Sequence, residues 1–259
     1  AAVYRFDGST WNQLGSTIST YGTSCNIALY SHYDSHMRVS ISSDGNRVCI
    51  SDPKSCDGYM EGLVRVFDWD VNNNSWLQVG NNIGETFPNT VTHNPQNHYH
   101  YGFSVAFNND GTKIAVGAPA TYIGSSLNGV GHVFTYQLLN NSWTQLGSPI
   151  LGEYGNGCSV SFSSDGYMLA VGESGNPWNG SNQGRVRVFE YNSNWTQLGS
   201  DIFYSNTNDK LVSLSDSGNV LAIVNNGNLS ILNFDNNTWD EQGNNITGSP
   251  DWPNSVSLS

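Results

Sequence analysis

Positive charge is what this sequence has least of. Its 259 residues include 9 lysines and arginines against 21 aspartates and glutamates, so the formal net charge is −12. The basic residues are scattered singly and form no stripe that could neutralise the phosphates of a nucleic acid. We therefore expect no nucleic-acid partner. An acidic surface is also repelled by anionic membranes.

Long hydrophobic runs are absent as well. No stretch approaches the roughly 20 apolar residues of a membrane span, so we expect no membrane insertion. The first residues already have the pattern of a strand rather than of a signal peptide, and a leader would have to lie upstream of them. Charged residues of both signs make up only 12% of the chain, about half the usual share. Asn, Ser, Thr and Gly supply the polarity instead, a composition typical of secreted or cell-surface proteins.

Catalytic motifs are missing too. The chain contains no nucleophile elbow, no phosphate-binding glycine loop and no metal dyad. Its Gly-x-Gly patterns lie in turns between predicted strands, with no helix after them. On this basis the chain is predicted to be non-enzymatic and to need no cofactor.

What the sequence does contain is an internal repeat centred on tryptophan. The tryptophans of the repeat stand 65, 67, 52 and 44 residues apart. The recurring segments are Trp11-Asn-Gln-Leu-Gly15, Trp76-Leu-Gln-Val-Gly80, Trp143-Thr-Gln-Leu-Gly147, Trp195-Thr-Gln-Leu-Gly199 and Trp239-Asp-Glu-Gln-Gly243. A repeat of this length that cannot bury its own faces is typical of a stacked architecture.

Each repeat has the pattern of four short strands. Two apolar runs flank an Asp-Gly turn, and a third run precedes the tryptophan segment. The turns are Asp44-Gly45, Asp110-Gly111, Asp165-Gly166 and the degraded Asp216-Ser217-Gly218. The third runs align as Val3–Phe6, Val64–Phe67, Val133–Tyr136, Val186–Phe189 and Leu229–Phe234. We predict an all-β fold: a β-propeller of four-stranded antiparallel blades with about five repeats.

The predicted boundaries make residues 1–259 a single propeller domain. Its units are 1–18 (partial), 37–83, 102–150, 157–202, 210–246 and 254–259 (partial). The first unit supplies only third and fourth strands, and the last supplies only a first strand. Two interpretations stay open: the two ends close a fifth blade that lacks its second strand, or sequence outside this window completes a larger ring.

Two families resemble these repeats. The segment Tyr101-Gly-Phe-Ser-Val-Ala-Phe-Asn-Asn-Asp-Gly-Thr-Lys-Ile-Ala-Val-Gly-Ala-Pro119 resembles the FG-GAP repeat of integrin α-subunit propellers and related extracellular proteins. Its turn lacks the alternating acidic residues that bind Ca²⁺ in that family, so no calcium site is expected. The segment Val160–Gly172 is similar to a WD40 blade without the closing Trp-Asp. Together they resemble repeats in extracellular proteins of marine microbes and algae.

These resemblances and the composition lead to one predicted function. The chain would be an extracellular, glycosylated, non-enzymatic propeller that acts as a structural or adhesive module and binds protein partners or copies of itself. One alternative is a glycan-binding propeller in which Tyr99 and Trp178 stack on sugars. Further alternatives are an intracellular WD40-like scaffold and a hydrolase or lyase with its site at the mouth of the axis.

Sequons for N-glycosylation are frequent. They stand at Asn73, Asn140, Asn179, Asn194, Asn228, Asn236 and Asn245. Four of them fall in the turn just before the repeated tryptophan, where a glycan would be accessible. The alternative is that asparagine is simply a good turn residue.

Two side-chain sets are further candidates for sites. Cys25 and Cys56 lie in loops predicted to emerge on one face of the same blade, which favours a disulfide between them. The other two cysteines, Cys49 and Cys158, are predicted to be core thiols. Four histidines in two equivalent loops could hold a metal ion, although exposed polar loop residues explain them as well: His32, His36, His98 and His100.

Overall fold

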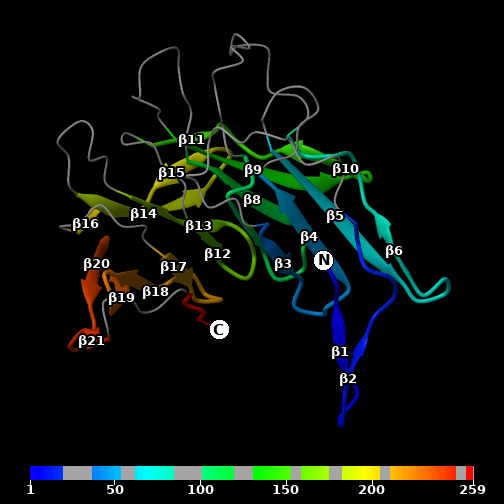
Figure 1. Cartoon of the computed structure of the whole chain (residues 1–259). Helices are drawn as coiled ribbons and strands as arrows, with labels where there is room; N and C mark the ends of the chain where they lie inside the picture. The colour runs from blue at the N-terminus through cyan, green and yellow to red at the C-terminus, as the bar shows by residue number, and fades with distance from the viewer. Residues whose placement is uncertain are drawn as a thin grey trace, which may run out of the picture.

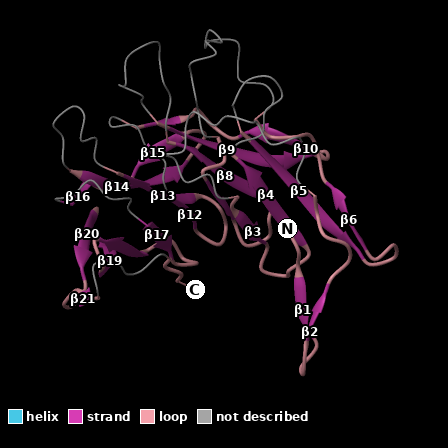
Figure 2. Ribbon diagram, viewed as in Figure 1, coloured by secondary structure: helices cyan, strands magenta, loops and turns pink. Residues whose placement is uncertain are grey.

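The structure is a computed structural model that describes residues 1–19, 37–53, 62–84, 101–119, 131–152, 159–174, 183–204, 211–248 and 255–258 (Figure 1). All of its regular structure is β-strand (Figure 2). Among these residues there is no helix with the length and hydropathy of a membrane span.

Four antiparallel sheets contain the predicted four-strand unit, with the strands in chain order. Blade 1 consists of β3 (Val39–Ile41), β4 (Arg47–Asp52), β5 (Leu63–Asp70) and β6 (Ser75–Gln78). Blade 2 consists of β7 (Ser104–Phe107), β8 (Lys113–Ala118), β9 (His132–Leu139) and β10 (Ser142–Gln145). Blade 3 consists of β12 (Ser159–Phe162), β13 (Met168–Glu173), β14 (Gly184–Tyr191) and β15 (Trp195–Gln197). Blade 4 consists of β17 (Leu211–Leu214), β18 (Val220–Asn225), β19 (Asn228–Asp235) and β20 (Thr238–Glu241). A hairpin of β1 (Tyr4–Phe6) and β2 (Trp11–Gln13) precedes them.

The blades follow one another around an arc, from the hairpin at one end to blade 4 at the other (Figure 1). Their first strands are neighbours: β3 contacts β7, β7 contacts β12, and β12 contacts β17. First strands that line a common axis define a β-propeller. The predicted fold class is therefore confirmed.

The outer edge of three blades contains a short strand that the repeat did not predict. β11 (Ile150–Leu151), β16 (Ile202–Tyr204) and β21 (Ile246–Thr247) pair with β9, β14 and β19, beside the tryptophan strand. The outer strand of each of these blades is therefore broken in two. The break falls at the glycine that ends the tryptophan segment, and Gly199, for example, has φ of 75° there. Glycine adopts this backbone conformation without steric cost.

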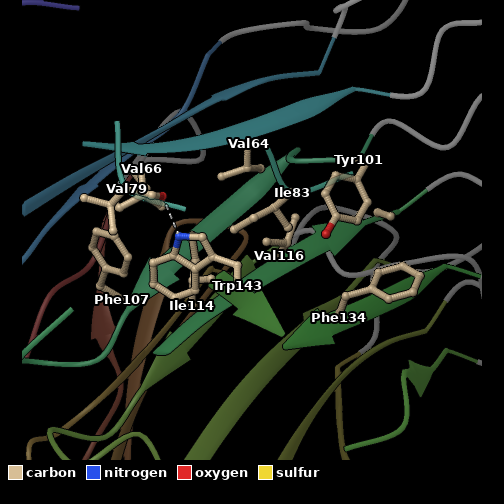
Figure 3. Close-up of a cluster of buried hydrophobic side chains, with 12 residues drawn as sticks. Val64, Val66, Val79, Ile83, Tyr101, Phe107, Ile114, Val116, Phe134 and Trp143 are labelled. Atoms are coloured by element: carbon tan, nitrogen blue, oxygen red, sulfur yellow. Dashed lines mark hydrogen bonds between the residues drawn. The ribbon is translucent and has the colours of Figure 1, made fainter. Parts of the chain in front are cut away.

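The repeated tryptophan connects each blade to the one before it. In blade 2, the indole Nε1 of Trp143 donates to the carbonyl oxygen of Val79 in blade 1 at 3.0 Å (Figure 3). The same bond joins Trp76 to Leu14 at 2.8 Å, Trp195 to Leu146 at 3.1 Å and Trp239 to Leu198 at 3.2 Å. The acceptor is always the residue just before the repeated glycine. A Trp-x-Gln-Leu-Gly segment with a blade on either side thus takes part in two such contacts: its tryptophan donates to the preceding blade, and the carbonyl before its glycine accepts from the following blade.

The hydrophobic core lies between blades rather than within them. One cluster combines Val64 and Val66 of blade 1 with Ile114, Val116 and Trp143 of blade 2 (Figure 3). Two similar clusters join blade 2 to blade 3 and blade 3 to blade 4. Because each sheet buries its faces only against its neighbours, a single blade has no core of its own. Cys49 belongs to the first cluster and is fully buried, as predicted, and burial raises the pKa of its thiol to about 12.

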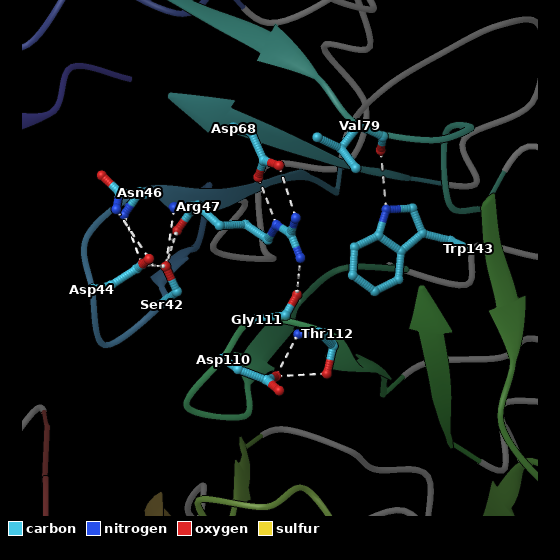
Figure 4. A network of polar contacts seen from close by, with 10 residues as sticks. All are labelled: Ser42, Asp44, Asn46, Arg47, Asp68, Val79, Asp110, Gly111, Thr112 and Trp143. Atoms are coloured by element: carbon cyan, nitrogen blue, oxygen red, sulfur yellow. Dashed lines mark hydrogen bonds and ion pairs between the residues drawn. The ribbon is translucent and has the colours of Figure 1, made fainter. Parts of the chain in front are cut away.

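The Asp-Gly turns form a belt at one end of the blades, called here the turn end. Backbone N–H groups donate from each turn to the next: Ser43 to Asn109 at 2.9 Å, Asn109 to Ser164 at 3.1 Å, and Ser164 to Asp216 at 2.9 Å. Within a turn, the Asp44 carboxylate accepts bonds from Ser42 and Asn46, which lower the pKa of Asp44 (Figure 4).

Long basic side chains reinforce this belt. Arg47 pairs with Asp68 of its own blade at 2.6 Å and donates to the Gly111 carbonyl of blade 2 at 3.0 Å (Figure 4). In the next blade Lys113 extends to the Asp165 carbonyl of blade 3 at 2.8 Å. The third interface has Met168 at the same position, packed on Gly218. Two of the few basic residues of the chain therefore hold blades together.

Serine hydroxyls connect the innermost strands. The amide of Phe107 donates to the Ser40 hydroxyl at 3.1 Å, and that of Leu214 donates to Ser161 at 3.0 Å. Residues 255–258, predicted to begin a first strand, form no strand in the structure. However, the Leu258 amide donates to Ser213 at 2.8 Å, which places this segment at the first-strand position after blade 4.

The sequence alignment of the N-terminal unit is wrong by two residues. We aligned Val3 with Val64 and Val186. In the structure the amide of Leu14 donates to the carbonyl of Val3, just as Val79 donates to Val66 and Leu198 to Val188. Val3 therefore corresponds to Val66, and Tyr4 to Phe67. A shift of two residues keeps every side chain on the same face of a strand, so the apolar pattern could not reveal it.

We predict that Trp143→Phe lowers the free energy of unfolding by about 1–3 kcal/mol, because the buried carbonyl of Val79 loses its donor. Trp69→Phe is the matched control, since the Trp69 indole nitrogen makes no hydrogen bond within the described part of the chain. Trp69→Phe should lower the free energy of unfolding by clearly less than Trp143→Phe. Urea unfolding followed by circular dichroism measures both, and equal losses would contradict the importance of the indole bond.

We also predict that Ala106→Ser stabilises the protein by about 0.5–1 kcal/mol. Ala106 occupies the position of Ser40 and Ser161 but has no hydroxyl to accept a bond from the amide of Phe162 in the next blade. Ala106→Val adds volume without a hydroxyl and serves as the control. A rise in melting temperature for Ala106→Ser that Ala106→Val does not share is the expected result; a fall for both would contradict it.

Candidate functional site

The opposite end of the blades, where each second strand finishes and each third strand begins, contains a buried group of charged side chains. We call this the Glu173 end. Glu173 is the last residue of β13, and Arg185 and Arg187 lie beside it on β14. Asp201 follows the tryptophan segment of the same blade. We refer to these four residues as the Glu173 cluster.

Glu173 is the centre of the cluster. Its Oε2 accepts from Nε of Arg185 at 3.0 Å, and its Oε1 accepts from Nε of Arg187 at 2.7 Å. Nη2 of Arg187 also forms an ion pair with the same Oε1. Arg185 continues to Asp201 through a bond of 2.9 Å between Nη1 and Oδ2. The side chain of Glu173 has no exposed surface, so its charge depends entirely on these partners.

The electrostatics of the cluster are balanced. Burial raises the pKa of Glu173, and the charges of Arg187 and Arg185 offset part of that shift. Two carboxylates and two guanidinium groups leave no net charge, so the cluster as a whole does not attract anions. Its most accessible carboxylate is Asp201, whose side chain is 23% exposed. Gln197 donates to Asp201 Oδ1 at 2.7 Å and fixes its orientation.

Arg187 also connects blades. Its Nη2 donates to the carbonyl of Leu151 in β11 at 2.7 Å, and Arg65 of blade 1 donates in the same way to Ser19 at 3.1 Å. The corresponding positions hold Phe134 in blade 2 and Ser230 in blade 4. Sequence reasoning missed this cluster. The available signal was a basic residue inside the apolar run Val-Arg-Val-Phe, which occurs twice.

Several predicted site residues lie outside the described residues. These are the metal candidates His32, His36, His98 and His100, the disulfide candidates Cys25 and Cys56, the stacking candidates Tyr99 and Trp178, and the sequon asparagine Asn179. Within the described ranges, no group of three or more His, Cys, Asp or Glu residues could hold a metal ion. These predictions therefore stay predictions.

The other sequons differ in accessibility. Asn73, Asn140, Asn194, Asn236 and Asn245 are exposed, whereas Asn228 is half-buried inside β19. Asn140 and Asn236 each begin a two-residue turn in which both residues have positive φ, between 47° and 65°. Asparagine tolerates this conformation better than most residues, so the backbone alone accounts for it there. The structure leaves glycosylation itself untested.

Comparisons with known proteins show similarity of structure only. No protein-family model matches the chain, and no curated protein matches its sequence. A Bacteroides fragilis protein named as a "putative 6-phosphogluconolactonase" superposes on this chain with a TM-score of 0.56 and a sequence identity of 13%. A protein of the same description from Bacteroides uniformis superposes with a TM-score of 0.60 and an identity of 11%. Each match covers 96% of this chain and 65% of the other. A Lactobacillus plantarum protein superposes with a TM-score of 0.58 and an identity of 16%, over 95% of this chain and 64% of the other.

A further match confirms the architecture. The propeller of Dos1 superposes with a TM-score of 0.50 and 11% identity, over 82% of this chain and 48% of that one. At these identities the similarities establish the fold alone, and FG-GAP or WD40 membership in particular is not established. This chain spans less than two thirds of the length of each of the two Bacteroides proteins and of the Lactobacillus protein.

These comparisons correct the predicted function. The prediction of a non-enzymatic adhesion module is wrong, because the similar propellers include proteins named as "putative 6-phosphogluconolactonase" and no comparison points to adhesion. The predicted extracellular location is not tested by these comparisons and stays a prediction. The prediction relied on the absence of familiar catalytic motifs. Propellers bring side chains together from strands far apart in sequence, so a short motif is a poor test for catalysis in this fold.

We predict that Glu173→Gln destabilises the protein by about 3–5 kcal/mol, since it leaves the buried Arg187 guanidinium without a counter-ion and Arg185 with Asp201 alone. Glu190→Gln is the matched control: the same substitution at an exposed position of the adjacent strand β14 should change stability by less than about 0.5 kcal/mol. Thermal and urea unfolding measure both. If the two variants were equally stable, the cluster would not contribute to folding.

Proposed function

We propose that this propeller is a hydrolase that opens a sugar lactone at the Glu173 end of its blades. The observation that supports the proposal is the structural similarity, over 95–96% of the chain, to propellers that include the two proteins named as "putative 6-phosphogluconolactonase". The Glu173 cluster is the second support, since it collects acidic and basic groups at one end of the fold. Both supports leave the reaction itself to be tested.

Hydrolysis of a lactone needs a base and a fixed water. The water oxygen bonds to the carbonyl carbon, the ring C–O bond breaks, and the ring oxygen takes up a proton. The products are a hydroxy acid in its carboxylate form and one released proton. A positioned carboxylate that accepts the proton of the attacking water contributes typically about 10²–10⁴-fold to such a reaction.

Asp201 is the carboxylate that we assign to this role. It is the member of the cluster that solvent reaches most, and Arg185 and Gln197 hold its two oxygens. Glu173 is a positioning residue, because it is buried and acts through the two arginines. This division of roles follows the general pattern in which a buried shell of polar contacts orients the reacting group.

Charge favours an uncharged substrate. The cluster is neutral as a whole and the chain carries a net charge of −12, so a phosphorylated lactone would approach against a repulsive field. We therefore expect a lactone without a phosphate group to be turned over faster than its phosphorylated counterpart, most clearly at low ionic strength.

The test is the rate of ring opening of glucono-1,5-lactone and of its 6-phosphate, followed by proton release. We expect turnover above the uncatalysed rate, with kcat/KM lowered by about 10²-fold or more in Asp201→Asn. Asp240→Asn, at an exposed position of β20, is the control that should leave the rate unchanged. Proton release no faster than in buffer for either lactone would refute the proposed activity.

Location and modification form a separate proposal. We propose an extracellular or cell-surface setting in which exposed turn asparagines such as Asn140 and Asn236 carry glycans. The composition and the exposure of these residues support it. A cytosolic hydrolase of the same fold would leave both asparagines unmodified.

A further inference from the structure

The interface between blades 3 and 4 differs from the two before it at the turn end. In blades 1, 2 and 3, the first residue of the second strand crosses the turn glycine of the following blade. The pairs are Arg47 on Gly111, Lys113 on Gly166 and Met168 on Gly218. Arg47 and Lys113 then donate to a backbone carbonyl of the following blade. Met168 ends in a thioether instead, so its contact with blade 4 is apolar.

The Met168 side chain lies directly against the backbone of Gly218. Its sulfur occupies the space that a Cβ at Gly218 would need, and its Cγ is 3.2 Å from that position. The side chain also packs against the apolar cluster shared by blades 3 and 4, which includes Leu221 and Leu232. A contact this close has no room for an additional polar atom on the sulfur.

Solvent nevertheless reaches Met168. The residue is half-buried, whereas Leu221 and Leu232 of the adjoining cluster are 0% and 2% exposed. The residue before it, Tyr167, is 46% exposed, so the turn that leads into this strand is open to water. Oxidation of methionine to the sulfoxide turns a flexible apolar side chain into a polar one, and exposure favours it. Met168 therefore combines an accessible sulfur with a contact that requires an apolar group.

We infer that Met168 is an oxidation site through which a hydroperoxide weakens the interface between blades 3 and 4. The thioether sulfur attacks one peroxide oxygen, and the O–O bond breaks. The transferred oxygen passes its proton to the leaving oxygen, which departs as water or an alcohol. The sulfur is oxidised by two electrons, and the peroxide is reduced by two. The product is methionine sulfoxide at position 168.

The sulfoxide oxygen is a hydrogen-bond acceptor that fits this interface badly. Two amides of the adjoining turns already have acceptors: Gly218 donates to the Ser215 carbonyl and Ser164 donates to the Asp216 carbonyl, both at 2.9 Å. A sulfoxide that stays in place buries a polar oxygen at a cost, and one that turns to water takes the side chain off Gly218. Either way the two blades hold together less strongly. This site is at the turn end and is independent of the proposed hydrolase activity.

The test is treatment of the whole chain with hydrogen peroxide, followed by peptide mapping and hydrogen exchange, both by mass spectrometry. We expect Met168 to gain one oxygen atom. Amides of blade 4 in residues 211–225 should then exchange at least about 5-fold faster, while those of blade 2 in residues 104–118 keep their rates. The melting temperature should fall by about 3–8 °C. An oxidised Met168 with unchanged exchange in blade 4 would overturn the inference, as would a Met168 that resists concentrations that oxidise the exposed Met37.

Variants make the test specific, because the chain has three methionines. A double variant, Met37→Leu with Met60→Leu, should respond to peroxide as the wild type does. Met168→Leu keeps an apolar contact and should lose the response, each variant being compared with its own untreated sample. Met168→Gln has a side chain of similar length with a polar end, and its blade 4 should exchange faster without any peroxide. A full response to peroxide in Met168→Leu would assign the effect to another residue and overturn the inference.

Discussion

The fold depends on one interaction, the hydrogen bond from a tryptophan indole to the carbonyl of the preceding blade. It requires a large apolar ring with one donor, and it requires a glycine beside the acceptor, where the ring packs against the backbone. The Trp-x-Gln-Leu-Gly segment contains both: the tryptophan contacts the preceding blade, and the glycine receives the tryptophan of the following blade. Because a blade has no core of its own, this contact and the apolar faces around it turn separate sheets into one structure.

The sequence predicted the parts of the fold that repeat. Period-two apolar runs, Asp-Gly turns and the spacing of the tryptophans together specified the four-strand unit. It could not predict what depends on register or on neighbours: the two-residue shift at Val3, or the short strands that follow the repeated glycine in three blades. The buried Glu173 cluster was missed because its members lie on two strands and in the segment before β16, and only the fold brings them together.

Function was predicted less well than fold for a related reason. The frequent asparagines suggested a glycosylated surface, yet turns such as Asn140-Asn141 and Asn236-Asn237 need residues that tolerate positive φ. The same residues therefore satisfy the backbone whether or not they carry sugars. The absence of catalytic motifs was also uninformative, because the polar groups of the Glu173 cluster lie on separate strands and form no short motif.

The interfaces between blades are not equal. An arginine reaches across at the Glu173 end in two of them, through Arg65 and Arg187, whereas the interface between blades 3 and 4 has Ser230 there and Met168 at the turn end. In a linear array, stability is approximately the sum of nearest-neighbour terms, so the array opens first where those terms are smallest. Among the described residues, blade 4 therefore joins blade 3 without a basic side chain across the interface, and we expect local opening to begin there while the first three blades remain stacked.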